Sequence, residues 1–347
     1  MVGKDNMRPA SARIGGVDWG VVGHRWAVEL LARQLARGTN HHAYLITGPD
    51  GVGRQRLALA LARAVLCERP PRPGDSCGEC RACEQVGRRV YPDLHVVERA
   101  DDRQGITIEQ IRDLQRQLSL APLAGRARVG ILLEMEKASE GAANALLKTL
   151  EEPAERVVLI LTASEAEAVP PTIASRCEVL ALRPVADEEI EQHLMARGAE
   201  AKAARQAARL AAGRPELALR FLDEPALLAR REAYRVELAD VLGMNLAGRF
   251  VQADAWKDDD DLEERLLAWM EGGRAALRGS LADGGAARSA EMSGVLDADA
   301  ARRLLLAIVR TLEGLRQNAN VRLALETLML DLPQARARPP EARRAAG

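Results

Sequence analysis

HHAYLITGPDGVGRQRLALALARAVLC, residues 41–67, is the stretch that decides the fold of this 347-residue chain. It holds an apolar segment typical of a β-strand (43–47), then a glycine-rich turn, then a Leu- and Ala-rich run that predicts a helix (54–66). The glycines of the turn are Gly48, Gly51 and Gly53. Strand, glycine turn and helix in this order are what a phosphate-binding loop needs, because glycine lets backbone N–H groups converge on a phosphate at a helix N-terminus.

The two residues after this turn depart from the pattern of an active nucleotide-binding loop. Gly48 and Gly53 have the spacing of the Walker A motif, which continues with lysine and then serine or threonine. This chain has Arg54 and Gln55 instead, so the ammonium for the β- and γ-phosphates and the hydroxyl for Mg²⁺ are both missing. We therefore expect a loop that keeps the geometry of phosphate binding but binds ATP weakly or not at all.

The composition bounds the class of protein. The chain is long enough for two or three domains, and 47% hydrophobic residues with only 3% aromatic ones predict cores of Leu, Ala and Val. Its 49 basic and 50 acidic residues leave a formal charge of −1, which argues against a protein that coats nucleic acid through bulk charge. The N-terminus lacks an apolar leader and no run approaches the roughly 18 apolar residues of a membrane span. We therefore expect a cytoplasmic protein whose cysteines are reduced.

Four of the five cysteines are clustered, namely Cys67, Cys77, Cys80 and Cys83. The tight CxxC steps in this cluster let thiolates converge on one tetrahedral ion, so we predict a structural zinc with no open coordination position. Free thiols or a redox pair are the alternatives, although a redox pair usually comes as a single CxxC motif. Arginines flank the cluster, but interleaved acidic residues cancel most of their charge. This balance disfavours a stand-alone zinc-dependent nucleic-acid binder.

Strand and helix patterns alternate as far as residue 182, which argues for a parallel α/β sheet. Further strands are predicted at 93–98, 129–133, 157–161 and 178–182. Further helices are predicted at 19–37, from 108 to 118 after a Thr107–Gln110 capping box, and at 141–152 after Ser139 as N-cap. The segment 163–172 is expected to be a loop.

The predicted strand at 129–133 ends without the residues of an ATP hydrolase. Such an enzyme would place an aspartate for Mg²⁺ there, followed by a glutamate that orients the attacking water. Leu133 cannot coordinate a metal, and Glu134 on its own is more typical of a solvated carboxylate than of a catalytic one.

Beyond residue 183 the sequence predicts helices only. They are expected at 187–197, 200–212, 215–222, 226–242, 260–281, 297–316 and 319–331. The acidic run at 258–261 would precede or cap a helix, and a glycine-rich loop is expected at 283–294. We expect residues 1–18 to be flexible and the tail, 333–347, to be disordered.

Together these motifs resemble the bacterial DNA polymerase III clamp-loader subunits, which are AAA+ proteins. The resemblance is carried by GPDGVGRQ, by the four-cysteine insert after the following helix, by AANALLKTLEEP at 142–153 and by SRC at 175–177. It covers about residues 17–225. It implies an AAA+ α/β module with a zinc insert, a small three-helix lid and an all-α collar that assembles a ring. The α/β module would be residues 19–183, with the zinc insert at 67–83. The lid would be residues 184–225, and the collar residues 226–332.

Two members of that family are the candidates. The γ/τ subunit is the ATP-driven motor with an intact Walker A motif, whereas the δ′ subunit typically carries a decayed one. Arg54, Gln55 and Leu133 depart from the motor pattern. Leu217 stands where the motor usually has a sensor arginine, and the nearby Arg214 is expected to start a helix. The resemblance therefore implies a δ′-like subunit that does not hydrolyse ATP, and a γ/τ-type ATPase is the alternative.

The SRC motif implies a role for Arg176. In the family this arginine sits at the subunit border and completes the ATP site of a neighbour, as an arginine finger supplied in trans. Ser175 would position the loop, and Cys177 is expected to be a small buried residue outside the zinc cluster. The implied partners are δ on one side and γ/τ on the other, in a hetero-pentamer that loads the sliding clamp onto primed DNA.

Overall fold

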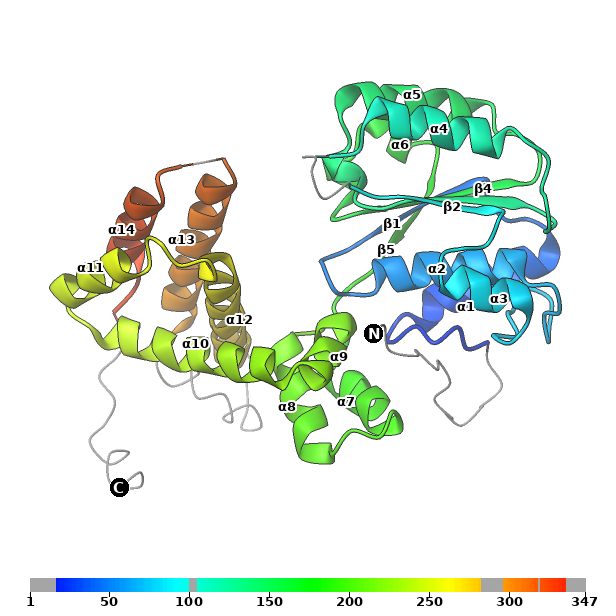
Figure 1. The fold of residues 1–347 in the computed structure, drawn as a ribbon. Coiled ribbons are helices and arrows are strands. Elements are labelled where there is room, and N and C mark those ends of the chain that lie inside the picture. Colours follow the sequence, from blue (N-terminus) through cyan, green and yellow to red (C-terminus); the bar gives the residue numbers. More distant parts are fainter. Residues whose placement is uncertain (1–16, 100–104, 282–295, 318, 335–347) are drawn as a thin grey trace. The chain divides into compact units, whose positions relative to one another are not determined.

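The computed structural model describes residues 17–99, 105–281, 296–317 and 319–334 (Figure 1). Their contacts divide the chain into two compact units, residues 1–222 and residues 223–347. The expected flexible N-terminus, the loop at 283–294 and the disordered tail lie wholly or almost wholly outside the described residues. None of the described helices is both long and apolar enough to cross a bilayer.

The first unit is built on a five-stranded parallel sheet, which confirms the predicted fold class. Its strands are β1 (Ala43–Thr47), β2 (Leu94–Val97), β3 (Arg128–Leu132), β4 (Val157–Ala163) and β5 (Glu178–Ala181). Their order across the sheet is β2-β3-β4-β1-β5, and all neighbouring strands are parallel. β1 is flanked on both sides, because Tyr44 pairs with Ile160 of β4 and with Glu178 of β5.

Helices cover both faces of this sheet (Figure 1). One face carries α1 (Arg25–Arg37), α2 (Arg54–Leu66) and α3 (Arg81–Gly87), and the other carries α4 (Ile108–Leu118), α5 (Glu140–Glu151) and α6 (Pro171–Ala174). Alternate residues of β1 point into two cores: Tyr44 and Ile46 join the core under α1 and α2, whereas Ala43 and Leu45 join the core under α4 and α5. Burial on both faces explains why the strands read as continuous apolar runs.

Two predicted helix caps are confirmed. The Thr107 hydroxyl accepts the N–H of Gln110 at 3.4 Å, and the Gln110 side chain accepts the N–H of Thr107 at 2.9 Å, which completes the capping box of α4. Ser139 caps α5 by accepting the N–H of Ala142 at 3.2 Å. These caps fix the starts of the two helices on the α4–α5 face.

Some predicted boundaries were wrong. The helix expected from residue 19 begins at Arg25, because Gly20 and Gly23 take left-handed conformations (φ 71° and 80°) that interrupt a helix. Three short helices were missed, namely α3, α6 and α11 (Leu246–Ala255). The N-cap of α3 is the sulfur of Cys80, and α6 has no side-chain cap, so neither carries the usual oxygen signal. Helix α11 does have such a signal, because the side-chain oxygen of Asn245 accepts the N–H of Gly248 at 2.9 Å.

Only helices follow β5, as predicted. They are α7 (Asp187–Ala196), α8 (Ala201–Ala211) and α9 (Pro215–Asp223), then α10 (Pro225–Gly243), α11, α12 (Leu262–Leu281), α13 (Ala298–Arg316) and α14 (Val321–Asp331). Two single turns of 3₁₀-helix, η1 (Met135–Lys137) and η2 (Ala166–Ala168), lie within the first unit. The compact units separate α10–α14 from the rest. The further division that makes 184–225 a separate lid stays a prediction.

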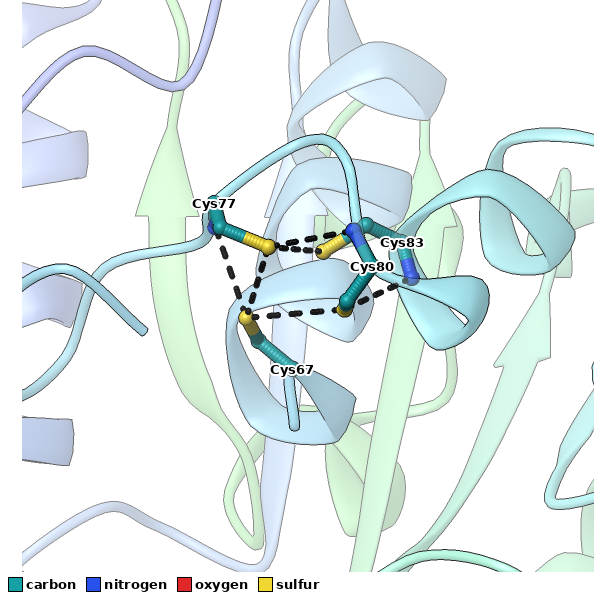
Figure 2. Close-up of side chains that lie close together, drawn as sticks. All are labelled: Cys67, Cys77, Cys80 and Cys83. Atoms are coloured by element: carbon teal, nitrogen blue, oxygen red, sulfur yellow. Dashed lines mark hydrogen bonds between the residues drawn. The ribbon is translucent and has the colours of Figure 1, made fainter. Parts of the chain in front are cut away.

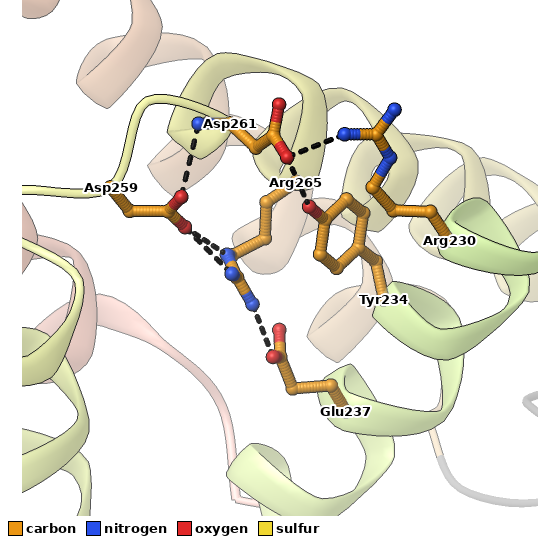
Figure 3. Close-up of polar contacts among 6 residues, drawn as sticks. All are labelled: Arg230, Tyr234, Glu237, Asp259, Asp261 and Arg265. Atoms are coloured by element: carbon orange, nitrogen blue, oxygen red, sulfur yellow. Dashed lines mark hydrogen bonds and ion pairs between the residues drawn. The ribbon is translucent and has the colours of Figure 1, made fainter. Parts of the chain in front are cut away.

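The second unit contains a buried arginine, Arg265 of α12, that contacts residues of neighbouring segments (Figure 3). Its guanidinium lies 4.5 Å from the ring centroids of both Tyr234 and Trp256. It also forms ion pairs with Asp259, at 2.6 Å, and with Glu237. Asp259 belongs to the acidic run of the sequence, which precedes α12 as expected, and its pairing with Arg265 is an additional contact. Two carboxylates and two aromatic rings therefore balance the positive charge of Arg265, as a buried charge requires.

Asp93, just before β2, is a fully buried acid in the first unit. Its carboxylate accepts the N–H groups of Leu123, Ala124 and Gly125 at 2.7 to 2.8 Å and lies 3.8 Å from the guanidinium of Arg128. Burial opposes ionisation, but these donors and the arginine outweigh it, so the pKa of Asp93 lies below its usual value. The carboxylate thus fixes the loop that leads into β3.

We predict that Asp93→Asn lowers the free energy of unfolding by about 2 to 4 kcal/mol at pH 7, since it removes the charge that three buried donors and Arg128 share. Because the folded-state pKa is depressed, this stabilisation is complete above the unfolded pKa of about 4 and is lost as the pH falls through the lower folded value. Urea unfolding of wild type and variant between pH 7 and pH 3 measures the difference, which should shrink with acid.

The control is Asp113→Asn, which removes an exposed acid that pairs with Arg116 on the surface of α4. An exposed pair contributes little, so this variant should unfold like wild type. Equal stability of the Asp93 and Asp113 variants at pH 7 would contradict the assignment.

Candidate functional site

The glycine turn lies between the end of β1 and the start of α2, as predicted. Gly48 has a φ of 145°, and a Cβ there would lie 2.7 Å from the carbonyl oxygen of Leu182. Gly53 is the N-cap of α2 with a φ of 114°. Neither position tolerates a side chain readily, the first because of close backbone packing and the second because of its left-handed conformation.

Arg54, in the position of the Walker lysine, points back onto this turn. Only 9% of its side chain is exposed, and its guanidinium forms an ion pair with Asp50 of the turn itself. A second carboxylate, that of Glu136, lies 3.8 Å from the other end of the guanidinium. The cation of the turn is therefore already matched by protein carboxylates. Neither acid was singled out from the sequence, because nothing in its spacing marks a partner for Arg54.

The segment after β3 presents Glu136, rather than Glu134, to the turn. Leu133 is buried, and Glu134 follows it in a left-handed conformation (φ 56°), with its N–H donated to the hydroxyl of Thr162 at 3.0 Å. The Glu134 carboxylate pairs with Lys137 at 2.7 Å. Glu136 instead accepts the N–H of Ser164 at 3.2 Å and reaches Arg54. Glu134, the glutamate that the sequence offered as a catalytic candidate, is therefore paired with a lysine at the surface.

Protein groups also contact the turn from other sides. The N–H of Glu216, in α9, donates to the carbonyl of Gly51 at 3.1 Å, and burial raises the pKa of the Glu216 carboxyl. His24 donates from Nε2 to the carbonyl of Val52 at 2.9 Å, and burial lowers its pKa. Arg214 immediately precedes α9, as expected for a residue at a helix start.

Ser175 and Arg176 lie in the turn between α6 and β5, and both donate to one acceptor. The Ser175 hydroxyl reaches the carbonyl of Thr172 at 3.3 Å, and Nη1 of Arg176 reaches the same oxygen at 2.8 Å. Nη2 of Arg176 lies 2.7 Å from the carboxylate of Glu151, the last residue of α5. The Arg176 side chain is 36% exposed, so its guanidinium is held in place but remains open to solvent.

The register of the sheet separates Arg176 from the glycine turn. Thr47, the last residue of β1, pairs with Ala181, the last residue of β5, so the glycine turn lies at the carboxyl edge of the sheet. Arg176 precedes β5 and lies at the opposite edge. Five residues of extended chain separate Arg176 from Ala181, which corresponds to roughly 16 Å. The two predicted site elements therefore do not form one site within this chain.

The four clustered cysteines do come together (Figure 2). Cys67 follows α2, Cys77 lies in the next loop, and Cys80 and Cys83 begin α3. Their four Sγ atoms all lie within 4.8 Å of one another. Neighbouring Sγ atoms are 3.7 Å apart for Cys67 and Cys77, 4.0 Å for Cys67 and Cys80, and 3.9 Å for Cys77 and Cys83.

This arrangement fits a tetrahedral metal ion. Zinc–sulfur bonds of about 2.3 Å would separate the sulfurs of a tetrahedral site by about 3.8 Å, which matches the distances found. Backbone N–H groups point at the sulfurs: that of Cys77 at Cys67, that of Cys80 at Cys77, and that of Cys83 at Cys80, at 3.2 to 3.5 Å. Such donors stabilise thiolates. The cluster could therefore hold a metal such as zinc.

The thiols of the cluster differ in acidity. Burial alone would raise the pKa of Cys80, but the backbone N–H groups of Cys83 and Glu68 and the neighbouring thiols bring it down to about 7. Burial raises the pKa of Cys67 and Cys83. Cys177 lies apart from the cluster, and burial raises its pKa to about 12, in agreement with a role in packing.

The family model described as DNA polymerase III, delta subunit, matches residues 23–186. The chain is 38% identical over 152 residues to the DNA polymerase III subunit delta′ of Pseudomonas aeruginosa, which covers 44% of this chain and 46% of that protein. It is 35% identical over 170 residues to the DNA polymerase III subunit tau of Bacillus subtilis, which covers 49% of this chain and 30% of that protein.

The chain spans less than half the length of these two relatives. Other relatives likewise carry the names delta′ and tau or gamma. A solved structure of a DNA polymerase III gamma subunit-related protein from Thermotoga maritima is 18% identical, covers 87% of this chain and 97% of that chain, and has a TM-score of 0.44.

We predict that purified protein carries about one zinc per chain and that Cys80→Ser abolishes stoichiometric zinc binding, because three thiolates no longer close the tetrahedron. Elemental analysis after dialysis against a chelator measures the content. Cys177→Ser is the matched control and should keep the metal, since Cys177 lies outside the cluster. A metal-free preparation that remains folded, or zinc retained by the Cys80 variant, would overturn the assignment.

Proposed function

Because this chain belongs, through residues 23–186, to the family of DNA polymerase III clamp-loader subunits, which are AAA+ proteins, we propose that it is a δ′-type subunit. In this proposal the chain does not hydrolyse ATP. It acts in the cytoplasm as part of a hetero-pentamer with δ and γ/τ subunits, which loads the sliding clamp onto primed DNA. Helices α7–α9 serve as the lid and α10–α14 as the collar.

The ion pair between Arg54 and Asp50 carries the proposal. A Walker lysine must be available to bind the β- and γ-phosphates, whereas Arg54 is buried against a carboxylate of its own turn and has Glu136 nearby. A triphosphate would have to compete with Asp50 and Glu136 for this guanidinium, or would place further negative charge beside both acids, and either effect opposes binding. The guanidinium also lacks the compact, flexible geometry of lysine.

The missing magnesium ligands support the same conclusion. Gln55 offers no hydroxyl at the start of α2, and Leu133 is buried at the position after β3 where a hydrolase has an aspartate. Glu134, which could have oriented water, is paired with Lys137. A motor subunit would need all three functions in one place.

Arg176 supplies the active contribution of this subunit in the proposal. The sheet register puts it at the edge opposite to the glycine turn of its own chain, so it cannot complete a site in cis. Its exposed guanidinium is instead suited to a phosphate on a neighbouring subunit, where such an arginine stabilises the charge that develops on the transferred phosphoryl group. Ser175 shares its acceptor and supports the turn.

The alternative is a γ/τ-type motor, and similarity to tau and gamma subunits is the observation that favours it. The two functions differ in ATP binding, since a motor must bind MgATP itself. A bound zinc has no bearing on this choice in the proposal, because four cysteine ligands leave no open position and the metal would only stabilise the insert at 67–83.

We expect isothermal titration of the isolated chain with ATP and Mg²⁺ to show no micromolar binding, and a phosphate-release assay to show no turnover. The reason is the ion pair of the buried Arg54 with Asp50, together with the absent magnesium ligands. A γ/τ subunit from the same organism, titrated in parallel, serves as the positive control. Micromolar binding with turnover by the isolated chain would favour the motor function.

We predict that Arg176→Ala lowers turnover at the ATP site of the neighbouring subunit by roughly 10³-fold or more, the range typical of arginine fingers. The measurement is the clamp- and DNA-stimulated ATPase rate of the complex reconstituted with γ/τ and δ. The total rate should fall by the fraction that the Arg176-dependent ATP site contributes to it. Arg37→Ala, at the exposed end of α1, is the control and should leave the rate unchanged. Unchanged activity of the Arg176 variant would refute the finger.

A further inference from the structure

We propose that Glu151 is a positioning residue, which orients the Arg176 guanidinium for its partner subunit. The inference rests on the proposed function of Arg176 and deepens it. The observation behind it is the 2.7 Å contact between the Glu151 carboxylate and Nη2 of Arg176, which joins two segments 25 residues apart in the sequence.

Two acceptors from different helices fix the guanidinium plane. Nη2 is held by Glu151 at the end of α5, and Nη1 is held by the carbonyl of Thr172 in α6 at 2.8 Å. One acceptor alone would leave the long side chain free to rotate about that contact. With two acceptors, the guanidinium is held in one orientation. The entropic cost of ordering the side chain is then incurred before a phosphate binds.

Both anchors stand on rigid backbone. Leu150, next to Glu151, is buried in the core under α4 and α5, and its carbonyl accepts a hydrogen bond from His42 at 3.1 Å. The turn that carries Arg176 is closed by its own N–H, which donates to the carbonyl of Ile173 at 3.0 Å, and Ile173 is fully buried in the same core. The position of the guanidinium is therefore tied to the core through short connections.

Arg176 has hydrogen-bond donors left after these two contacts. A guanidinium has five N–H donors, and Glu151 and Thr172 take one each, so three remain for a ligand. More than a third of the Arg176 side chain and half of the Glu151 side chain are exposed. Arg176 can thus stay bound to Glu151 while it donates to a phosphate of the neighbour.

This ion pair contributes little to folding, because exposed pairs are screened by water. A change at Glu151 should therefore be measurable in catalysis while the fold stays intact. Glu152, the next residue, is an exposed acid outside α5 and makes no hydrogen bond or ion pair to Arg176. It offers a matched control for the loss of one negative charge.

The test uses the complete complex reconstituted with γ/τ and δ and measures its clamp- and DNA-stimulated ATPase. We expect Glu151→Ala to lower the kcat of the Arg176-dependent site about tenfold, with the KM for ATP unchanged, because orientation matters mainly in the transition state. Glu151→Gln keeps an acceptor and should recover part of the loss. Glu152→Ala should behave as wild type, and thermal unfolding should be the same for all variants.

The double variant separates the inference from the proposed function. If Glu151 acts through Arg176, then Glu151→Ala has no further effect once Arg176→Ala is present. An equal loss in both backgrounds, or an equal loss from Glu152→Ala, would overturn the positioning role. Wild-type activity of Glu151→Ala beside a strongly impaired Arg176→Ala would refute the positioning role and leave the finger standing. Wild-type activity of Arg176→Ala would refute the finger and the inference together.

Discussion

The parallel register of β1 with β5 is the constraint on which the rest of the site depends. Because Tyr44 pairs with Glu178 and Thr47 with Ala181, the two segments with functional motifs are sent to opposite edges of the sheet. One edge carries the glycine turn, and the other carries the turn with Arg176. Within one chain, the glycine turn and Arg176 are therefore too far apart to act on one ligand.

The glycine turn is held in place by contacts within the protein. Gly48 is needed because the backbone of Leu182 passes where a Cβ would stand, and this need is independent of any phosphate. The turn is further bound by His24 and by the N–H of Glu216. The cation that a nucleotide would require is matched internally by Asp50. Close backbone packing at Gly48 and the left-handed conformation of Gly53 account for these two glycines without a nucleotide.

Much of the fold was predictable, because apolar runs and oxygen caps such as Thr107 and Ser139 are local signals. The spacing of the cysteines was also sufficient to predict that their four sulfurs lie together. The contacts of Arg54 with Glu136 and of Arg176 with Glu151 were not predictable, because each joins residues far apart in the sequence through the packing of the sheet. Helix α3 was not predicted because its cap is a cysteine sulfur, from the four-cysteine cluster, and not an oxygen.

The position of the cysteine cluster gives a reason for a metal without catalysis. Cys67 lies directly after α2, and Cys80 and Cys83 are buried in the core that α2 shares with α1 and the sheet. An ion bound there would fasten the carboxyl end of α2 to α3. The glycine turn lies at the other end of the same helix, about 20 Å away for thirteen residues. A structural metal would thus hold α2 firmly against the sheet at one end, while the packed glycine turn holds it at the other, and no phosphate is needed to order the helix.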